Sequence, residues 1–74
     1  MKETYIKKGN IVIRFSRCNL TKIATIITNY GCTFTEDEKY FDTSEEGNAF
    51  YIQCRNDGFV NATMNDYSRI VNGY

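Results

Sequence analysis

The stretch CRNDGFVNATM, residues 54 to 64, contains the clearest turn signal in the chain, Asn56-Asp57-Gly58. A three-residue loop with its glycine left-handed places Cys54 opposite Val60 and makes one face of a hairpin wholly apolar. A two-residue loop would place Cys54 opposite Asn61 and mix polar and apolar residues on both faces. We therefore expect a hairpin with the three-residue loop, whose buried face comprises Phe50, Ile52, Cys54, Val60, Ala62 and Met64.

Residues 51 to 63, YIQCRNDGFVNAT, resemble the opening hairpin of KilA-N domains, which occur in large DNA viruses and phages. In that family a string of the form D-G-[FY]-[VI]-N-A-T leads into the helices of a DNA-binding module. Eleven residues follow Thr63 here, and their opening, MNDY, departs from a lysine-containing continuation. We therefore expect the helical body of that family to be absent, and we transfer none of its sites to this chain.

The N-terminal segment TYIKKGNIVIRFS, residues 4 to 16, has two apolar runs around Lys7-Lys8-Gly9-Asn10, which has turn chemistry. After this turn, Ile11, Ile13 and Phe15 alternate with other residues, as in a strand with one buried face. The segment predicts a strand and favours a hairpin.

The next segment, NLTKIATIITNYG, residues 19 to 31, has apolar residues at helical spacing. Asn19 is suited to cap the start of a helix and Gly31 to close its end. We expect a helix over about 19–31, with an apolar stripe formed by Leu20, Ile23, Ala24, Ile27 and Tyr30.

The remaining segments predict one strand, one loop and one short helix. A strand begins near Cys32, and residues 39 to 41 either continue it past a bulge or form the return arm of a hairpin. Residues 43 to 48 have the composition of a loop, and Asn65 or Asp66 is suited to cap a short C-terminal helix. The predicted fold class is α+β: a small single domain, 1–74, with an antiparallel sheet and the 19–31 helix packed on one face.

Composition excludes several classes of function. The 74 residues contain no histidine, no nucleophile or phosphate-loop motif, and three widely spaced cysteines without a C-x-x-C pair. We expect no catalytic activity, no metal site and no cofactor. No apolar run approaches the length of about 20 residues that spans a bilayer, and no secretory signal is visible, so we expect a cytoplasmic protein without a membrane partner. Abundant Asn, Ile, Lys and Tyr indicate an AT-rich gene of a phage, a virus or a bacterium. If the gene belongs to a phage, the expected location is the host cytoplasm.

Charge is polarised along the chain although the net charge is zero. Residues 1 to 31 carry six basic residues and one acidic residue, whereas residues 32 to 50 carry six acidic residues and one lysine. An acidic patch of this kind can dock on a basic groove, as small nucleic-acid mimics do, and tyrosine and arginine are enriched at protein interfaces. The expected partner-binding residues are Glu36, Asp37, Glu38, Tyr40, Asp42, Glu45, Glu46, Tyr51, Arg55 and Phe59.

These features predict a non-catalytic protein–protein interaction module. We expect a phage- or mobile-element-encoded inhibitor or modulator of a larger host protein, of the anti-defence or nucleic-acid-mimic type. The alternative is a small nucleic-acid-binding domain that uses the N-terminal basic residues and a sheet face with Tyr51, Arg55 and Phe59. A homodimer also stays open, and the sequence does not identify the partner or the effect of binding.

Overall fold

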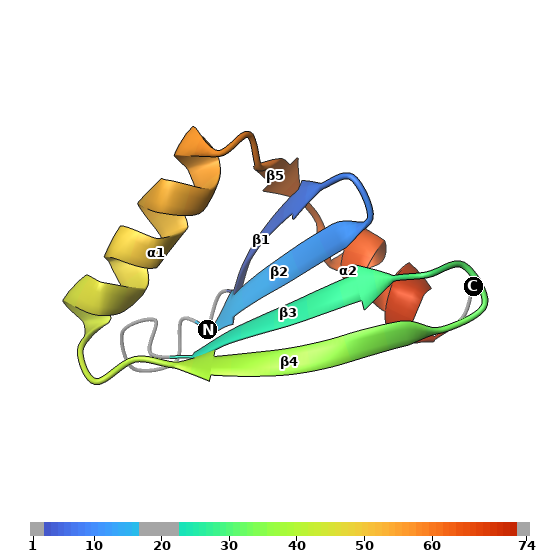
Figure 1. Cartoon of the computed structure of the whole chain (residues 1–74), viewed down its shortest axis with the longest axis horizontal. Coiled ribbons are helices and arrows are strands. Elements are labelled where there is room, and N and C mark those ends of the chain that lie inside the picture. Colours follow the sequence, from blue (N-terminus) through green and yellow to red (C-terminus); the bar gives the residue numbers. More distant parts are fainter. Residues whose placement is uncertain (1–2, 17–22, 73–74) are drawn as a thin grey trace.

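The computed structural model describes residues 3–16 and 23–72. Five strands and two helices follow one another in the order β1 (Glu3–Lys8), β2 (Ile11–Ser16), β3 (Ile23–Asn29), β4 (Phe34–Tyr40), α1 (Ser44–Asn56), β5 (Val60–Ala62) and α2 (Met64–Val71). The strands form one sheet in the order β4-β3-β2-β1-β5, and all neighbouring strands are antiparallel (Figure 1). The predicted α+β class with an antiparallel sheet is confirmed.

The N-terminal hairpin is confirmed as well. β1 pairs with β2 so that Lys8 lies opposite Ile11, which leaves Gly9 and Asn10 as the loop. Gly9 has a φ of 59°, a left-handed conformation that glycine adopts without the penalty a side chain would bring. The Asn10 side chain also donates a hydrogen bond of 2.8 Å to the carbonyl oxygen of Asn29, which ties the loop to the end of β3.

The predicted helix over 19–31 is wrong. Residues 23 to 29 form β3, which pairs with β2 on one side and β4 on the other; the expected start of the helix, residues 19–22, lies outside the described residues. Five of the seven residues of β3 are isoleucine or threonine, whose β-branched side chains favour strands. Because helices cover both faces of this strand, apolar residues occur on both, and the resulting pattern imitates helical spacing. Gly31, with a φ of 89°, belongs to the β3–β4 turn and does not end a helix.

The predicted hairpin around residues 54 to 64 is also wrong in its first arm. Residues 44 to 56 form α1, whose start includes the predicted loop 43–48 and whose N-cap, Thr43, accepts a hydrogen bond from the backbone N–H of Glu46. Asp57-Gly58 is a turn, as predicted, but it joins a helix to β5, and β5 pairs with β1. The resemblance to a KilA-N hairpin therefore does not extend to the fold of residues 51 to 63.

Two further expectations concern β4 and the C-terminus. β4 runs without interruption from Phe34 to Tyr40, so Lys39 and Tyr40 continue the strand and form no return arm. The C-terminal helix is confirmed as α2, but its N-cap is Thr63 and not Asn65 or Asp66.

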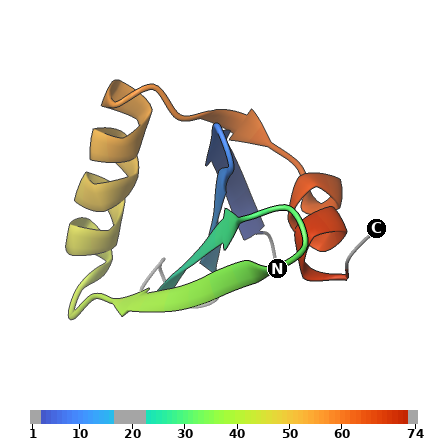
Figure 2. The same cartoon turned by 45° about the vertical axis from the view of Figure 1, so that its right-hand side comes forward.

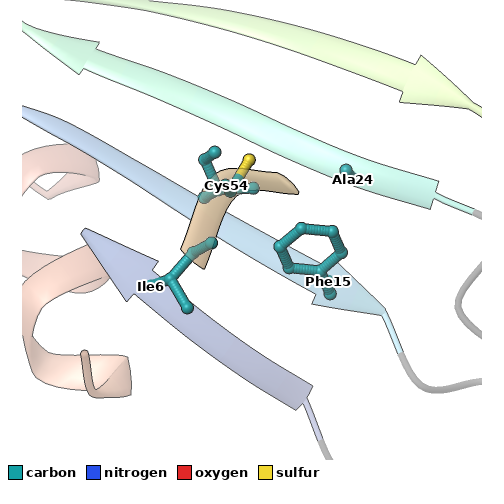
Figure 3. Close-up of a cluster of buried hydrophobic side chains, with 5 residues drawn as sticks. Ile6, Phe15, Ala24 and Cys54 are labelled. Carbon is teal, nitrogen blue, oxygen red and sulfur yellow. The ribbon is translucent and has the colours of Figure 1, made fainter. Parts of the chain in front are cut away.

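The helices lie on opposite sides of the sheet, as Figure 2 shows, so the sheet has an α1 face and an α2 face. On the α1 face, Cys54 of α1 packs on the strands among Ile6, Ile13, Phe15 and Ala24, part of which Figure 3 shows. On the α2 face the core consists of Tyr5, Val12, Ile27 and Tyr67. The longer helix on a face of the sheet is therefore α1, residues 44–56, and not the predicted helix over 19–31. In the part of the chain that the structure describes, neither helix has the length and apolarity needed to cross a bilayer.

Candidate functional site

β4, one of the two edge strands of the sheet, carries three of the six predicted acidic residues, Glu36, Asp37 and Glu38. Among the described strands it pairs with β3 alone, and every residue from Thr35 to Tyr40 is exposed. Successive side chains of a strand point to opposite faces. The register with β3 therefore places Glu36, Glu38 and Tyr40 on the α2 face and Asp37 on the α1 face.

The backbone of β4 presents hydrogen-bonding groups to solvent along its outer side. At the end of β3, the backbone N–H of Asn29 points toward β2 and donates to the carbonyl oxygen of Asn10 at 2.8 Å. The next N–H, that of Tyr30, points toward β4 and donates to the carbonyl oxygen of Thr33, also at 2.8 Å. Because the backbone groups of a strand alternate in direction, every second residue of β4 bonds inward to β3. The residues left with N–H and C=O groups directed outward are Phe34, Glu36, Glu38 and Tyr40.

Acidic residues continue from the end of β4 into the start of α1, which follows directly in the chain (Figure 1). Asp42 lies in the connection, and Glu45 and Glu46 lie in the first turn of the helix. The Glu46 carboxylate accepts a hydrogen bond of 3.0 Å from the backbone N–H of Asp42. Negative charge at this position stabilises the helix, whose N-terminus carries a partial positive charge. Part of the acidic segment therefore has a structural role.

We call the set Glu36, Asp37, Glu38, Asp42, Glu45 and Glu46 the acidic edge. Among the residues described, ion pairs join Lys7 to Asp66 and Arg14 to Glu3, and none involves the acidic edge. The one cation within the segment, Lys39, extends over the rings of Phe41 and Phe50, at 5.7 and 5.6 Å from the ring centres. The negative charge of the acidic edge is thus left uncompensated by its described neighbours.

Tyr40 is tied to the acidic edge by a hydrogen bond. Its hydroxyl donates to Oε1 of Glu38 at 2.7 Å on the exposed α2 face of β4. This bond and the adjacent negative charge raise the pKa of Tyr40, because both favour the protonated phenol. Tyr40 therefore orients one carboxylate and keeps an exposed aromatic ring beside it.

The other predicted residues, Tyr51, Arg55 and Phe59, lie away from the acidic edge. Tyr51 packs edge-on against Phe15 at a centroid distance of 5.3 Å, and Phe59 packs against the same core. The Arg55 guanidinium donates hydrogen bonds to the Tyr51 hydroxyl and to the side chain of Asn61 on β5, the opposite edge strand. The structure therefore divides the predicted site in two, and this second group serves to hold the end of α1 against the sheet.

The basic residues of β1 and β2 do not gather into one patch. Lys8 lies on the α1 face and donates a hydrogen bond of 2.6 Å to the carbonyl oxygen of Asp57. Lys7 lies on the α2 face, 3.4 Å from Asp66, and the Arg14 guanidinium there lies 4.8 Å from the centre of the Tyr67 ring. The other three basic residues between positions 1 and 31, Lys2, Arg17 and Lys22, lie outside the described residues.

Two cysteines, Cys32 and Cys54, and a pocket lie in the described part of the chain, whereas Cys18 lies outside it. Burial raises the pKa of the Cys54 thiol, which makes it a poor nucleophile. Cys32 is exposed and lies at a small open pocket of about 220 Å³ between the β3–β4 turn and the end of α2. Within residues 3–16 and 23–72, no cluster of three or more cysteine, aspartate or glutamate side chains is arranged to hold a metal ion.

Sequence reasoning missed two features of the α2 face. Thr25 is almost fully buried at the centre of the sheet, and Arg14 stacks on Tyr67. Thr25 is buried because β3 lies between β2 and β4, and Arg14 meets Tyr67 because α2 packs on β2; both depend on tertiary structure. Comparison of the chain with protein-family models, with curated proteins and with solved structures found no match.

Proposed function

We propose that this protein is a non-catalytic protein–protein interaction module that docks through its acidic edge on a basic surface of a larger protein. The observation that carries the proposal is the row of exposed carboxylates on β4 without a cationic partner among the described residues. Uncompensated charge on an edge attracts a partner of opposite charge and accelerates encounter. Tyr40 belongs to the docking surface because its ring lies exposed beside Glu38.

The spacing of the carboxylates supports an inhibitor or modulator of the nucleic-acid-mimic type. A β-strand rises about 3.4 Å per residue, and one strand of duplex DNA carries one phosphate per about 3.4 Å of helix axis. Glu36, Asp37 and Glu38 therefore repeat negative charge along the axis of β4 at the axial spacing of phosphates, with Asp37 on the opposite face from the other two. A host protein that binds nucleic acid through a basic groove is the class of partner that fits best, as for a phage-encoded protein that blocks such a groove.

The competing function, nucleic-acid binding by this chain itself, has less support. Lys7, Lys8 and Arg14 lie on both faces of the sheet and are engaged with Asp66, the backbone of Asp57 and Tyr67. Phosphate binding requires several cations on one surface. The carboxylates along β4, the longer of the two edge strands, repel the phosphates of a nucleic acid.

The test uses two variants that each remove two negative charges. Glu36→Gln/Glu38→Gln neutralises the acidic edge, and Glu3→Gln/Asp57→Asn makes the same change in net charge away from β4. Tagged wild type and both variants are used for affinity capture from host lysate with and without nuclease treatment, and each captured protein is then purified for titration at several salt concentrations. We expect a purified partner whose Kd rises with salt concentration. The Kd should also rise for Glu36→Gln/Glu38→Gln but not for Glu3→Gln/Asp57→Asn.

Two results would contradict the proposal. Equal weakening by both variants would show that net charge and not the acidic edge determines binding. Capture that disappears after nuclease treatment, together with salt-dependent retention of the purified protein on immobilised DNA, would establish the nucleic-acid-binding alternative.

A further inference from the structure

We propose that β4 binds its partner by strand addition: an extended segment with three consecutive basic residues joins the sheet as a sixth strand next to β4. The inference rests on the proposed function and specifies the form of its partner. The juxtaposition that carries it is an open strand edge on which Glu36 and Glu38 direct their backbone groups outward, within the run of three carboxylates that has no described cationic partner.

The open edge supplies the hydrogen bonds. β4 is seven residues long, and in the described part of the chain no strand pairs with its outer side. Its outward N–H and C=O groups, at Phe34, Glu36, Glu38 and Tyr40, match the repeat of a partner strand. An extended peptide that joins such an edge gains affinity from main-chain hydrogen bonds and specificity from its side chains.

The side chains specify the sequence of the added strand. Glu36 and Glu38 lie on the α2 face and Asp37 on the α1 face, so residues directly opposite them alternate between the faces in the same way. A peptide with basic residues at every second position could pair on one face only. Three consecutive basic residues pair with all three carboxylates, and the next position, opposite Lys39, then favours an acidic residue.

A second copy of this chain does not fit the same edge. If two β4 strands pair in antiparallel register about Asp37, that residue faces its own copy, and Glu36 faces Glu38. Like charges directly opposite one another destabilise strand pairing. The carboxylates therefore disfavour self-pairing in this register while they favour a cationic strand, and charged side chains on edge strands protect natural sheets from aggregation in the same way.

The test separates backbone pairing from charge attraction. The probe is a synthetic peptide with, in order, a valine, an acidic residue, three basic residues, a threonine and a valine. Its control has the same side chains and charge, but the amide nitrogens that would face β4 are methylated and cannot donate. We expect the control to bind wild type at least about tenfold more weakly, because lost main-chain bonds are not replaced. The amide protons of Glu36 and Glu38 should become protected from exchange only with the first peptide.

A pair of variants gives the same comparison from the side of the protein. Glu36→Pro removes an outward N–H that makes no bond to β3, and proline is tolerated on edge strands. Glu36→Gln makes the same change in charge but keeps that N–H. We expect Glu36→Pro to bind the peptide several-fold more weakly than Glu36→Gln, with both variants folded by circular dichroism.

The outcomes distinguish this inference from the proposed function. If the methylated and parent peptides bind equally, strand addition is refuted, while docking by charge on the acidic edge stands. If neither peptide binds wild type, strand addition is refuted too, and the proposed function is decided by the purified partner. If Glu36→Pro does not fold, the two peptides on wild type still decide the question.

Discussion

The most informative prediction compares Ile27→Ala with Ile52→Ala, the same chemical change at two depths. Ile27 is fully buried in the core of the α2 face, whereas the Ile52 side chain on α1 is 57 % exposed. Ile27→Ala removes three buried carbon atoms, a transfer term of about 2.4 kcal/mol at about 0.8 kcal/mol per carbon. The cavity adds to this, so the measured range for such changes is about 2–5 kcal/mol.

That loss is large for so small a domain. For 74 residues the free energy of unfolding is expected to lie at about 4–11 kcal/mol. The free energy of unfolding falls by about 1 kcal/mol per M of urea for a domain of this size. In a urea titration followed by circular dichroism, the unfolding midpoint of Ile27→Ala should therefore lie about 2 M or more below that of wild type. Ile52→Ala should change the midpoint by less than about 0.5 M.

The comparison also tests the structure against the hairpin that the sequence predicts. In that hairpin Ile52 belongs to the buried face, and its replacement would be as costly as that of Ile27. Equal midpoint shifts for the two variants would show that Ile52 is buried and would refute α1 as the element that contains it.

Three other changes test local features. Gly58→Ala should destabilise the protein by about 1–3 kcal/mol, measured as a lower melting temperature, because Gly58 has a φ of 109°, which a residue with a Cβ adopts only with strain. Thr63→Ala removes the side chain that accepts from the backbone N–H of Asp66 at the start of α2, and urea titration should show a loss of about 1 kcal/mol. The backbone N–H of Thr63, which donates to the Asp66 carboxylate at 3.0 Å, lowers the pKa of Asp66 from 3.8, and Lys7 adds to the effect. The stability that this carboxylate contributes is therefore present above pH 4 and is lost as the pH falls through the lowered pKa. In urea titrations repeated over that acid range, the free energy of unfolding of Asp66→Asn should fall less than that of wild type.

The parts of the fold that the sequence predicted correctly have local causes. The β1–β2 hairpin follows from alternating apolar residues around a glycine that must adopt a positive φ. α2 follows from a short amphipathic segment after a capping residue, although the cap is Thr63, whose side chain and that of Asp66 each accept from the other's backbone N–H. Such signals depend on a few neighbouring residues and need no tertiary context.

β3 was assigned incorrectly because its burial is a tertiary property. Thr25 and Ile27 face α2, and Ala24 and Ile26 face the side of α1, so no alternation of polar and apolar residues is visible. A strand buried on both faces cannot be told from a buried helix by spacing alone. Its β-branched composition was the better guide, and it favours the strand.

α1 was missed for the opposite reason. Its first turn consists of residues that are common in loops, but Thr43 caps the helix and Glu45 and Glu46 stabilise its N-terminus. The inner side of α1 contains Cys54 and the residues three and four positions before it, Tyr51 and Phe50, which is helical spacing. The hairpin prediction instead placed Phe50, Ile52 and Cys54, at strand spacing, on one buried face. The two periodicities share two of their three residues here, and only the exposure of Ile52 separates them.

The candidate site was predictable where it is contiguous in the chain. Glu36 to Glu46 form one edge because β4 leads directly into α1. Tyr51, Arg55 and Phe59 were grouped with this segment through the predicted hairpin, and once that hairpin becomes a helix and β5 they lie toward the other edge. A surface that depends on which strand is outermost requires the topology, and sequence spacing does not supply it.

The two edges of the sheet are protected by different means, and this affects how the acidic edge must be tested. β5 has three residues and offers little backbone to another chain, whereas β4 has seven, and we infer that its carboxylates repel a second copy of the strand. Neutralising Glu36 and Glu38 therefore weakens attraction for a basic partner and also removes repulsion between copies of the protein. A neutralised variant that dimerises at concentrations where wild type is monomeric would show that charge alone keeps this edge open. Binding to a partner must then be compared below that concentration, where lost affinity reports on the carboxylates and not on competition from a second β4.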